Sequence, residues 1–269
     1  MSQREVIGLV PMAGRATRLS PLPCSKELFP IAMPDSDGSA RPKVVSHFLL
    51  ERMRLAEIRK AFLVIREGKW DIPAYYRDGT EILDLSLAYI VARLPYGPPF
   101  SLDTAYPFVQ DAIVAMGFPD ILFQPDDAFS HLIARQEATQ ADLVLGLFPL
   151  PEHLVDDMTE LDESGRVRRY YIKQRVPHLS HSWMIAAWAP SFTQFMHEYL
   201  REYLRANGAP AQEFGMAHVM HAAVEAGLLV QTVTFHDGRF LDIGTPQGLM
   251  QLSTFLDAGN SGLRSTQSL

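Results

Sequence analysis

The sequence predicts an α/β fold with a Rossmann-like, mostly parallel central sheet flanked by helices. Apolar runs long enough for buried strands occur at residues 6–10, 60–65 and 141–148. A helical pattern of apolar residues, over residues 42–58, separates the first two runs. A strand, a helix and a strand in this rhythm pair in parallel through a right-handed crossover.

The composition suits a single large domain. The chain has 269 residues, of which 47% are hydrophobic, enough for a sizeable core. We expect one domain over residues 1–256 and a mobile tail over residues 257–269, where small and polar residues dominate. The formal net charge of -7 argues against a nucleic-acid partner, because such proteins favour basic patches.

A single cysteine and the absence of a long apolar run indicate the compartment. Cys24 alone cannot form an intramolecular disulfide, and we expect a small buried or loop thiol rather than a nucleophile. No apolar run approaches the ~20 residues that a membrane span needs. The N-terminus leads directly into an apolar strand, unlike a signal peptide. These features predict a cytoplasmic protein with no membrane partner.

The first strand leads into a segment of small residues, 11–18, that carries Arg15 and Arg18. Small residues such as Gly14 let backbone N–H groups approach a phosphate, and the arginines supply fixed positive charge. Prolines then stiffen the segment that holds Lys26. On spacing alone, a plain strand–turn–helix with surface arginines explains the pattern equally well.

The stretch resembles the signature of the sugar-1-phosphate nucleotidyltransferases, the family typified by glucose-1-phosphate thymidylyltransferase. That signature is a strand followed by G-G-x-G-T-R-L-x-P and then by K and P, and the matching residues here are Thr17, Arg18, Leu19, Pro21, Lys26 and Pro30. Ala13-Gly14 replaces the paired glycines, and Ala16 stands where a glycine is usual. The resemblance implies a fold of nucleotide-diphospho-sugar transferase type, with residues 1–256 as a single catalytic domain. It also implies four nucleotide-binding residues, Ala13, Gly14, Arg15 and Thr17.

The next segments are a polar loop at 35–39, a strand at 85–91 and a rigid, proline-rich loop at 93–102. Ser101 or Asp103 can cap the helix that follows. In the family, the loop at this place contacts the base. The resemblance therefore adds Ser101 to the nucleotide-binding residues.

An apolar strand at 113–123 is interrupted by Gly117 and Asp120. In the family, a strand here ends in a turn whose aspartate binds magnesium, and Asp120 is the nearest match. A charge inside an apolar run is costly unless it is paired or bound to a cation, although a strand-end turn residue is the simpler alternative. Asp126 and Asp127 are a rival pair, which we interpret as the N-cap of a helix at 128–139.

The second half of the chain alternates strands and helices. After the strand at 141–148 we expect an acidic turn at 158–165, a short strand at 167–172 and another at 182–189. A helix over 190–205, a helix over 215–227 and a strand over 228–235 follow.

Three residues of this half match the family. Lys173 matches a lysine that reaches the sugar phosphate, although a solvated basic strand end explains it as well. Glu213 matches a glutamate that bonds a sugar hydroxyl. The segment 240–246 resembles the W-x-D-x-G-T-P element, in which Asp242 would be the second magnesium aspartate and Thr245 would cap the last helix.

The resemblance implies magnesium-dependent transfer of a nucleotidyl group from a nucleoside triphosphate to a sugar 1-phosphate. The products are an NDP-sugar, used in nucleotide-sugar biosynthesis, and pyrophosphate. Arg18 and Lys26 would be catalytic and contact the phosphates, and Mg2+ would lie between Asp120 and Asp242. The enzyme would be of the thymidylyl- or uridylyltransferase kind, and relatives often form homo-oligomers.

Two alternatives compete with this interpretation. A catalytically impaired homologue would bind a nucleotide or sugar phosphate in a regulatory role, which the altered glycine positions favour. A dinucleotide-dependent oxidoreductase would need a G-x-G-x-x-G after the first strand, which is absent.

Overall fold

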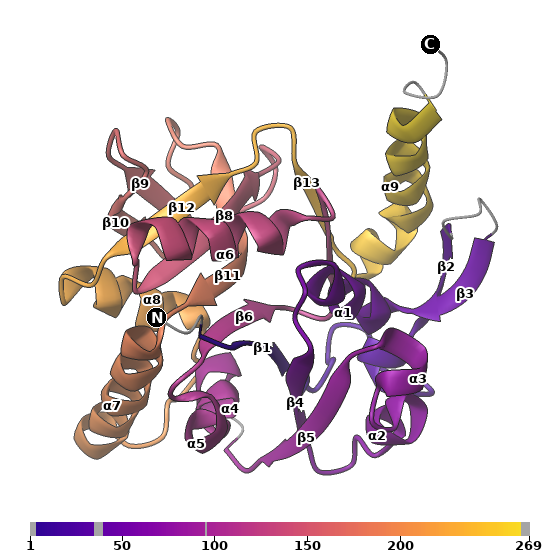
Figure 1. The fold of residues 1–269 in the computed structure, drawn as a ribbon, viewed down its shortest axis with the longest axis horizontal. Helices are drawn as coiled ribbons and strands as arrows, with labels where there is room; N and C mark the ends of the chain where they lie inside the picture. Colours follow the sequence, from indigo (N-terminus) through magenta and orange to yellow (C-terminus); the bar gives the residue numbers. More distant parts are fainter. Residues whose placement is uncertain (1–3, 35–39, 95, 265–269) are drawn as a thin grey trace.

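The computed structural model describes residues 4–34, 40–94 and 96–264. Within this part, a nine-stranded mixed sheet carries helices on both faces (Figure 1), and two further pairs of strands lie beside it. The strands follow one another in space as β10-β9-β11-β6-β1-β4-β5, and β8 pairs with both β11 and β12. The predicted fold class, α/β with a mostly parallel central sheet flanked by helices, is confirmed.

The strands are β1 (Val6–Pro11), β2 (Pro30–Pro34), β3 (Ala40–Val44), β4 (Lys60–Arg66), β5 (Ser86–Ala92), β6 (Ile113–Gly117), β7 (Ile121–Gln124), β8 (Leu143–Pro149), β9 (Met158–Leu161), β10 (Val167–Tyr171), β11 (His181–Trp188), β12 (Val230–Thr234) and β13 (Arg239–Asp242). The helices are η1 (Lys26–Leu28), α1 (Val45–Leu55), α2 (Asp71–Tyr76), α3 (Thr80–Leu83), α4 (Pro98–Asp103), α5 (Tyr106–Val109), α6 (Ala128–Thr139), α7 (Pro190–Asn207), α8 (Met216–Glu225) and α9 (Pro246–Arg264).

The parallel part of the sheet contains a change of direction in the strand order. From β1 the chain moves outward to β4 and β5, and it then returns to β6 on the other side of β1. The carboxyl ends of β4, β1 and β6 therefore lie together at one edge. In open α/β sheets, ligands bind outside this edge at the point where the order reverses.

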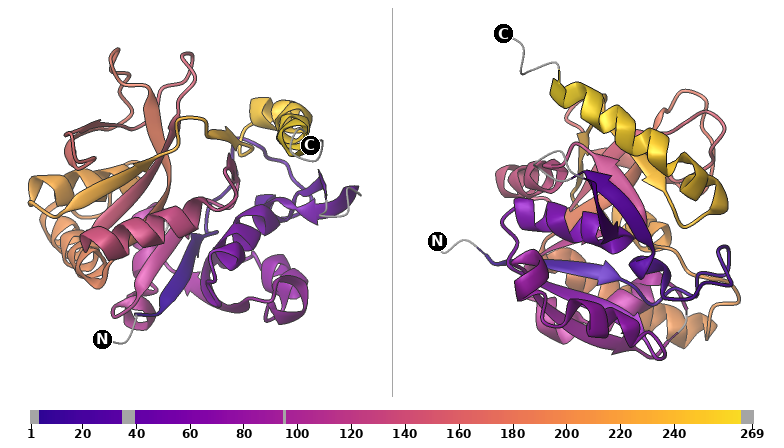
Figure 2. Two further views of the ribbon diagram at one scale, coloured as in Figure 1. Left: turned by 45° about the horizontal axis from the view of Figure 1, so that its top comes forward. Right: turned by 90° about the vertical axis from the view of Figure 1, so that its right-hand side faces the viewer.

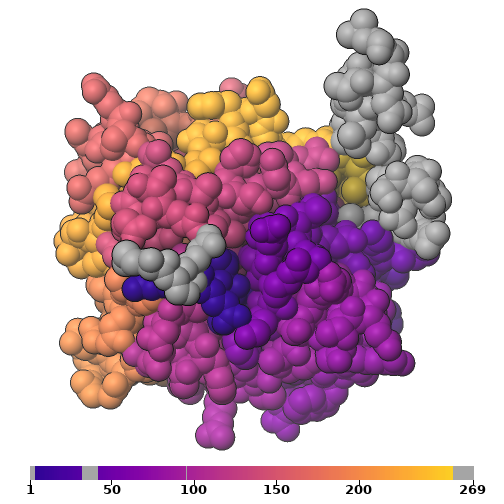
Figure 3. Space-filling model, viewed as in Figure 1, coloured from indigo at the N-terminus to yellow at the C-terminus, as the bar shows by residue number. Residues whose placement is uncertain are grey.

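Alternate residues of the central strands face two separate hydrophobic cores. Val10 belongs to the core beneath α1 and α6, whereas Leu9 belongs to the core beneath α4, α7 and α8. Figure 3 shows α1 and α6 side by side on the surface of the first face. Burial on both faces explains the continuous apolar runs of these strands.

The sheet becomes antiparallel beyond β6. Strand β11 runs antiparallel to both β6 and β8. Residues 158–165, expected to be an acidic turn, instead begin with β9, which pairs with β10. The turn prediction was wrong for residues 158–161, because the buried Met158 pairs with Ser182 of β11, a contact between distant parts of the chain. Residues 162–165 do form a turn, in which the Gly165 N–H donates to the Asp162 carbonyl at 3.0 Å.

Two further predictions need correction. The helical pattern expected from Pro42 begins at Val45, because Pro42 lies in β3 opposite Ala32. The proline-rich stretch 93–102, expected to be irregular, contains α4, which begins at Pro98 because a proline at the first helical position lacks only an N–H that would have no partner there. The predicted polar loop 35–39 lies outside the described residues.

Helix α9 continues past residue 256 to Arg264, and Figure 2 shows it in yellow, extending away from the rest of the chain. The expected tail at 257–269 therefore begins within a helix, and residues 265–269 lie outside the described part. Among the helices that the structure describes, none is both long and apolar enough to cross a bilayer.

Candidate active site

The site lies where three chain segments leave the sheet edge formed by β1, β4 and β6. The segment after β1 holds Lys26, and the segment after β6 holds Asp120. The Lys26 Nζ donates to Asp120 Oδ2 at 2.6 Å, and their side chains are 17% and 10% exposed. Burial lowers the pKa of Lys26, but Asp120, together with the charges of Glu27 and Asp242, raises this pKa above its usual value.

Asp242 reaches the same place through a two-stranded ladder. Strand β13 pairs with β7 so that Asp242 lies opposite Ile121, and the Ile243 N–H donates to the Asp120 carbonyl at 2.9 Å. A side chain at Gly244 would clash with Asp120 Oδ2 and would lie 2.9 Å from Asp242 Oδ1. Both carboxylates therefore face one small space, which only a glycine at position 244 leaves open.

The charges at this place suit a divalent cation. Burial and the negative charge of Asp120 raise the pKa of Asp242. The Arg18 guanidinium lies 3.6 Å from Asp242 Oδ2 and is 62% exposed. The described residues contain no group of three or more acidic, histidine or cysteine ligands, so an ion here would take two carboxylates and draw its other ligands from substrate or water. Mg2+ commonly binds in this way.

The signature turn has an unusual backbone at Ala16, the position where the family signature has a glycine. Ala16 adopts φ +53°, in the left-handed region that favours glycine, and its carbonyl accepts from the Leu19 N–H at 3.0 Å. Arg15 and Thr17 are exposed beside it. A Cβ at Gly14 would lie 3.9 Å from Lys26 Nζ, so the backbone there directly faces the lysine.

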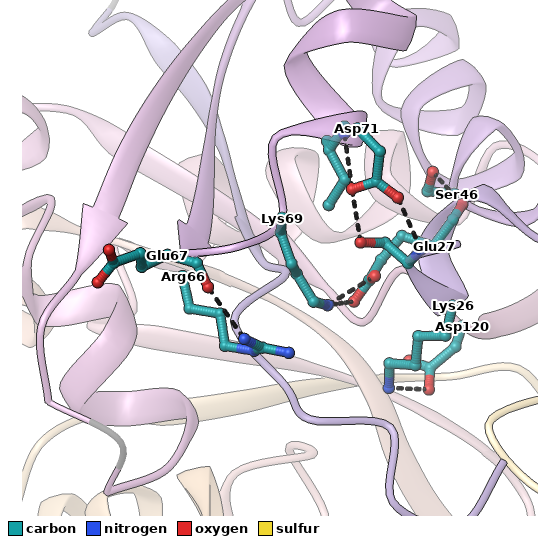
Figure 4. Close-up of polar contacts among 10 residues, drawn as sticks. Lys26, Glu27, Ser46, Arg66, Glu67, Lys69, Asp71 and Asp120 are labelled. Atoms are coloured by element: carbon teal, nitrogen blue, oxygen red, sulfur yellow. Dashed lines mark hydrogen bonds and ion pairs between the residues drawn. The ribbon is translucent and has the colours of Figure 1, made fainter. Parts of the chain in front are cut away.

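The segment around Lys26 is anchored by buried contacts that the sequence alone did not indicate. The Glu27 carboxylate is fully buried and accepts from the Lys69 Nζ with both oxygens, each at 2.7 Å. The Ser46 hydroxyl donates to the Glu27 carbonyl at 2.7 Å. Asp71 accepts from the Ser25 N–H and hydroxyl, each at 2.7 Å. Figure 4 shows Asp71, Lys69 and Glu27 near one another.

The sequence feature that could have indicated these contacts is the charged segment directly after the strand at 60–65. Lys69 and Asp71 leave the carboxyl end of β4, which is the neighbour of β1, so they meet the signature segment. Burial raises the pKa of Glu27 and lowers the pKa of Lys69, as each group loses hydration. Cys24 lies beside them, and burial and the charges of Asp71 and Glu27 raise its pKa, which makes it a poor nucleophile.

The structure brings Glu213 to the loop that was expected to contact the base. Gly97 adopts φ +120°, and a Cβ there would collide with the backbone of Phe214. The Phe214 N–H donates to the Tyr96 carbonyl at 2.8 Å, which fixes the two segments together. Glu213 is exposed at this junction. Ser101 is buried within α4, and its hydroxyl donates to the Gly97 carbonyl at 3.3 Å, so its side chain lies within its own helix.

Lys173 follows β10 in a strained turn with φ +45°, and its side chain is exposed. Its N–H donates to Asp157 Oδ1 at 2.9 Å, and Trp183 Nε1 donates to Asp157 Oδ2 at 3.3 Å. The Trp183 ring packs on Phe118 with centroids 5.8 Å apart. This chain of contacts links the Lys173 turn to the segment that carries Asp120.

The two predicted helix caps differ in outcome. The predicted N-cap position of α6 is confirmed for Asp127, but the capping hydrogen bond of its side chain is absent. Asp126 does not cap the helix, because it accepts from the buried Arg52 on α1 at 2.6 Å. Thr245 does cap α9, because its hydroxyl accepts from the Gly248 N–H at 3.0 Å.

Comparisons of the whole chain with known proteins bear on the fold. No family model and no curated protein sequence matches the chain. A structure from Bacillus anthracis, assigned as a glucose-1-phosphate thymidylyltransferase and solved in complex with sucrose, superposes with a TM-score of 0.78 at 14% identity, over 93% of this chain and 95% of the other. The chain shares the fold of that protein.

A second solved structure, a UDP-glucose pyrophosphorylase from Acinetobacter baumannii, superposes with a TM-score of 0.70 at 16% identity. The match covers 92% of this chain and 91% of the other. The resemblance inferred from the signature is thus confirmed at the level of the fold, across nearly the whole length.

Proposed function

We propose that this protein transfers a nucleotidyl group from a nucleoside triphosphate to a sugar 1-phosphate. A phosphate oxygen of the sugar 1-phosphate forms a bond to the α-phosphorus. The bond from that phosphorus to the bridging oxygen breaks, and the oxygen keeps the electron pair and leaves in pyrophosphate. The nucleophile is already an anion, so the protein needs no covalent residue and acts by positioning substrates and balancing charge.

The phosphate groups would be held by the residues near the sheet edge. Lys26 contacts the α-phosphate, the exposed Arg18 contacts the leaving phosphates, and the backbone of the Ala13–Gly14 turn lies along the nucleotide. Asp120 and Asp242 would hold Mg2+, which supplies charge stabilisation at the phosphate oxygens when bound. Lys173 and Glu213 are proposed to contact the sugar phosphate and a sugar hydroxyl.

One observation carries the proposal: Lys26, Asp120, Asp242 and Arg18 meet at one point, although they come from three distant segments. Two positive and two negative side chains at a sheet edge suit a phosphate and a divalent cation together. The fold shared with two sugar nucleotidyltransferases supports the same reaction class.

The test is an assay for pyrophosphate release with Mg2+, crossing the common nucleoside triphosphates with a panel of sugar 1-phosphates. Release that requires both substrates supports the transferase and identifies its pair, including the choice between thymidylyl and uridylyl transfer. No release with any pair, together with thermal stabilisation by a nucleotide, contradicts it and favours a binding homologue.

A further inference from the structure

A cavity of about 320 Å³ lies between the signature segment and the turn that follows β4. This volume falls in the range of about 300–1,000 Å³ that is typical of small-molecule sites. Its walls are largely polar, and the charged residues that line it are Arg15, Lys26, Arg66, Lys69 and Asp71. None of the residues on the β4 side, including Arg66, belongs to the signature.

Two of these charges are balanced within the protein, and the carboxylate oxygens of a third, Asp71, are held by hydrogen bonds. Lys26 is paired with Asp120, and Lys69 with the buried Glu27. Asp71 accepts two hydrogen bonds from Ser25.

The two arginines of the cavity differ from these groups. Among the described residues, neither Arg15 nor Arg66 forms an ion pair with a carboxylate. Arg66 donates from one terminal nitrogen to the Glu67 carbonyl at 2.9 Å, and its buried Nε has no hydrogen-bond partner. Figure 4 shows the Arg66 guanidinium directed toward the side on which Lys69 and Lys26 lie. The cavity thus presents two uncompensated guanidinium groups, each suited to bidentate binding of phosphate oxygens.

We propose that this cavity binds the terminal diphosphate of the nucleoside triphosphate, with Arg66 as a binding residue and Arg15 as its partner from the signature turn. This inference rests on the proposed function and extends it. Lys26 lines the cavity and also contacts Asp120, so the cavity adjoins the point where the aspartates meet. The bridging oxygen that gains the electron pair would enter a cationic space, and Arg66 would stabilise the charge of the departing pyrophosphate.

The test measures binding of inorganic pyrophosphate by titration calorimetry in metal-free buffer, which removes any contribution of a cation at the aspartates. We expect Arg66→Gln to weaken binding by about tenfold or more, as expected for loss of a charge-assisted hydrogen-bond pair. Arg66→Lys should lose part of this affinity, because it keeps the charge but not the fork. The matched control is Arg59→Gln, which precedes the other end of β4 and pairs with the exposed Asp84.

The outcomes separate this inference from the proposed function. Wild-type binding that Arg66→Gln weakens and Arg59→Gln preserves supports the cavity, even if no substrate pair releases pyrophosphate. Equal affinity of wild type and Arg66→Gln overturns the cavity assignment, even if the transferase is active. If Arg66→Gln melts below the assay temperature, Arg66→Lys decides: unchanged affinity for pyrophosphate overturns the proposal. In an active enzyme, Arg66→Lys should also raise KM for pyrophosphate in the reverse reaction without raising KM for the NDP-sugar.

Discussion

The anchored segment, residues 25–27, and the signature turn, residues 15–18, belong to the same loop but are held in different ways. Each residue of the anchored segment has a partner from another element: Ser25 has Asp71, Lys26 has Asp120, and Glu27 has Lys69. The signature turn is exposed, and its side-chain contact to Asp242 is a long one of 3.6 Å.

Under the proposed function, this difference would give the two segments different roles. A lysine that must meet a phosphate in one geometry gains from a fixed support, because the ordering cost is met during folding. An arginine that contacts departing phosphates gains from freedom to follow them. The comparison therefore predicts that the anchored segment dominates stability and that the signature turn contributes little to it.

The largest effect should come from breaking the buried pair. Lys69→Met leaves the fully buried Glu27 without its partner, and we expect a loss of about 3–5 kcal/mol in the free energy of unfolding, measured by urea denaturation. The double variant Glu27→Leu with Lys69→Met should recover most of this loss, because two apolar side chains replace the pair. A single variant as stable as wild type would contradict the anchoring role.

The next effect concerns the contact between Lys26 and Asp120. Asp120→Asn removes the negative charge that faces both Lys26 and the proposed Mg2+. We expect turnover to fall by about a hundredfold or more and to require a higher Mg2+ concentration. Asp84→Asn, which alters an exposed carboxylate bound by Arg54 and Arg59, is the control. Unchanged turnover and Mg2+ dependence in Asp120→Asn would contradict the assignment.

A smaller effect should follow from Asp71→Ala, which removes the acceptor for Ser25. Loss of these two hydrogen bonds should cost about 1–3 kcal/mol and raise hydrogen exchange in residues 20–30. Burial opposes the low pKa of Asp71, but the bonds from Ser25 hold it below its usual 3.8.

This low pKa gives the Asp71 prediction a pH dependence. The stabilisation is present above pH 3.8, because the carboxylate is then ionised in the folded state. It is lost as the pH falls further and the carboxylate is protonated. The difference between wild type and Asp71→Ala should therefore shrink in acid, and a constant difference would exclude Asp71 as its cause.

Local pattern was enough to predict the central strands and helix α6. The resemblance to the family was enough to predict that Asp120 and Asp242 lie close together, because the two matching aspartates of the family are both magnesium ligands. The pair of Glu27 and Lys69 could not be predicted, because it joins residues that meet only when β1 and β4 become neighbours. The same limit applies to β9, whose pairing with β11 depends on a distant strand.

The smallest effect concerns Ala16, in the signature turn. Its φ of +53° costs an alanine about 1–2 kcal/mol, whereas glycine adopts it freely but loses about 0.5–1 kcal/mol through the entropy of the unfolded chain. Ala16→Gly should therefore raise the free energy of unfolding by about 0.5–1 kcal/mol. The matched control is Ala13→Gly, at a position without a positive φ, which should not stabilise. Equal changes in the two variants would show that the turn is not strained at Ala16. A higher free energy of unfolding in Ala16→Gly alone would show that the signature turn keeps a backbone conformation that favours glycine, although this chain has an alanine there.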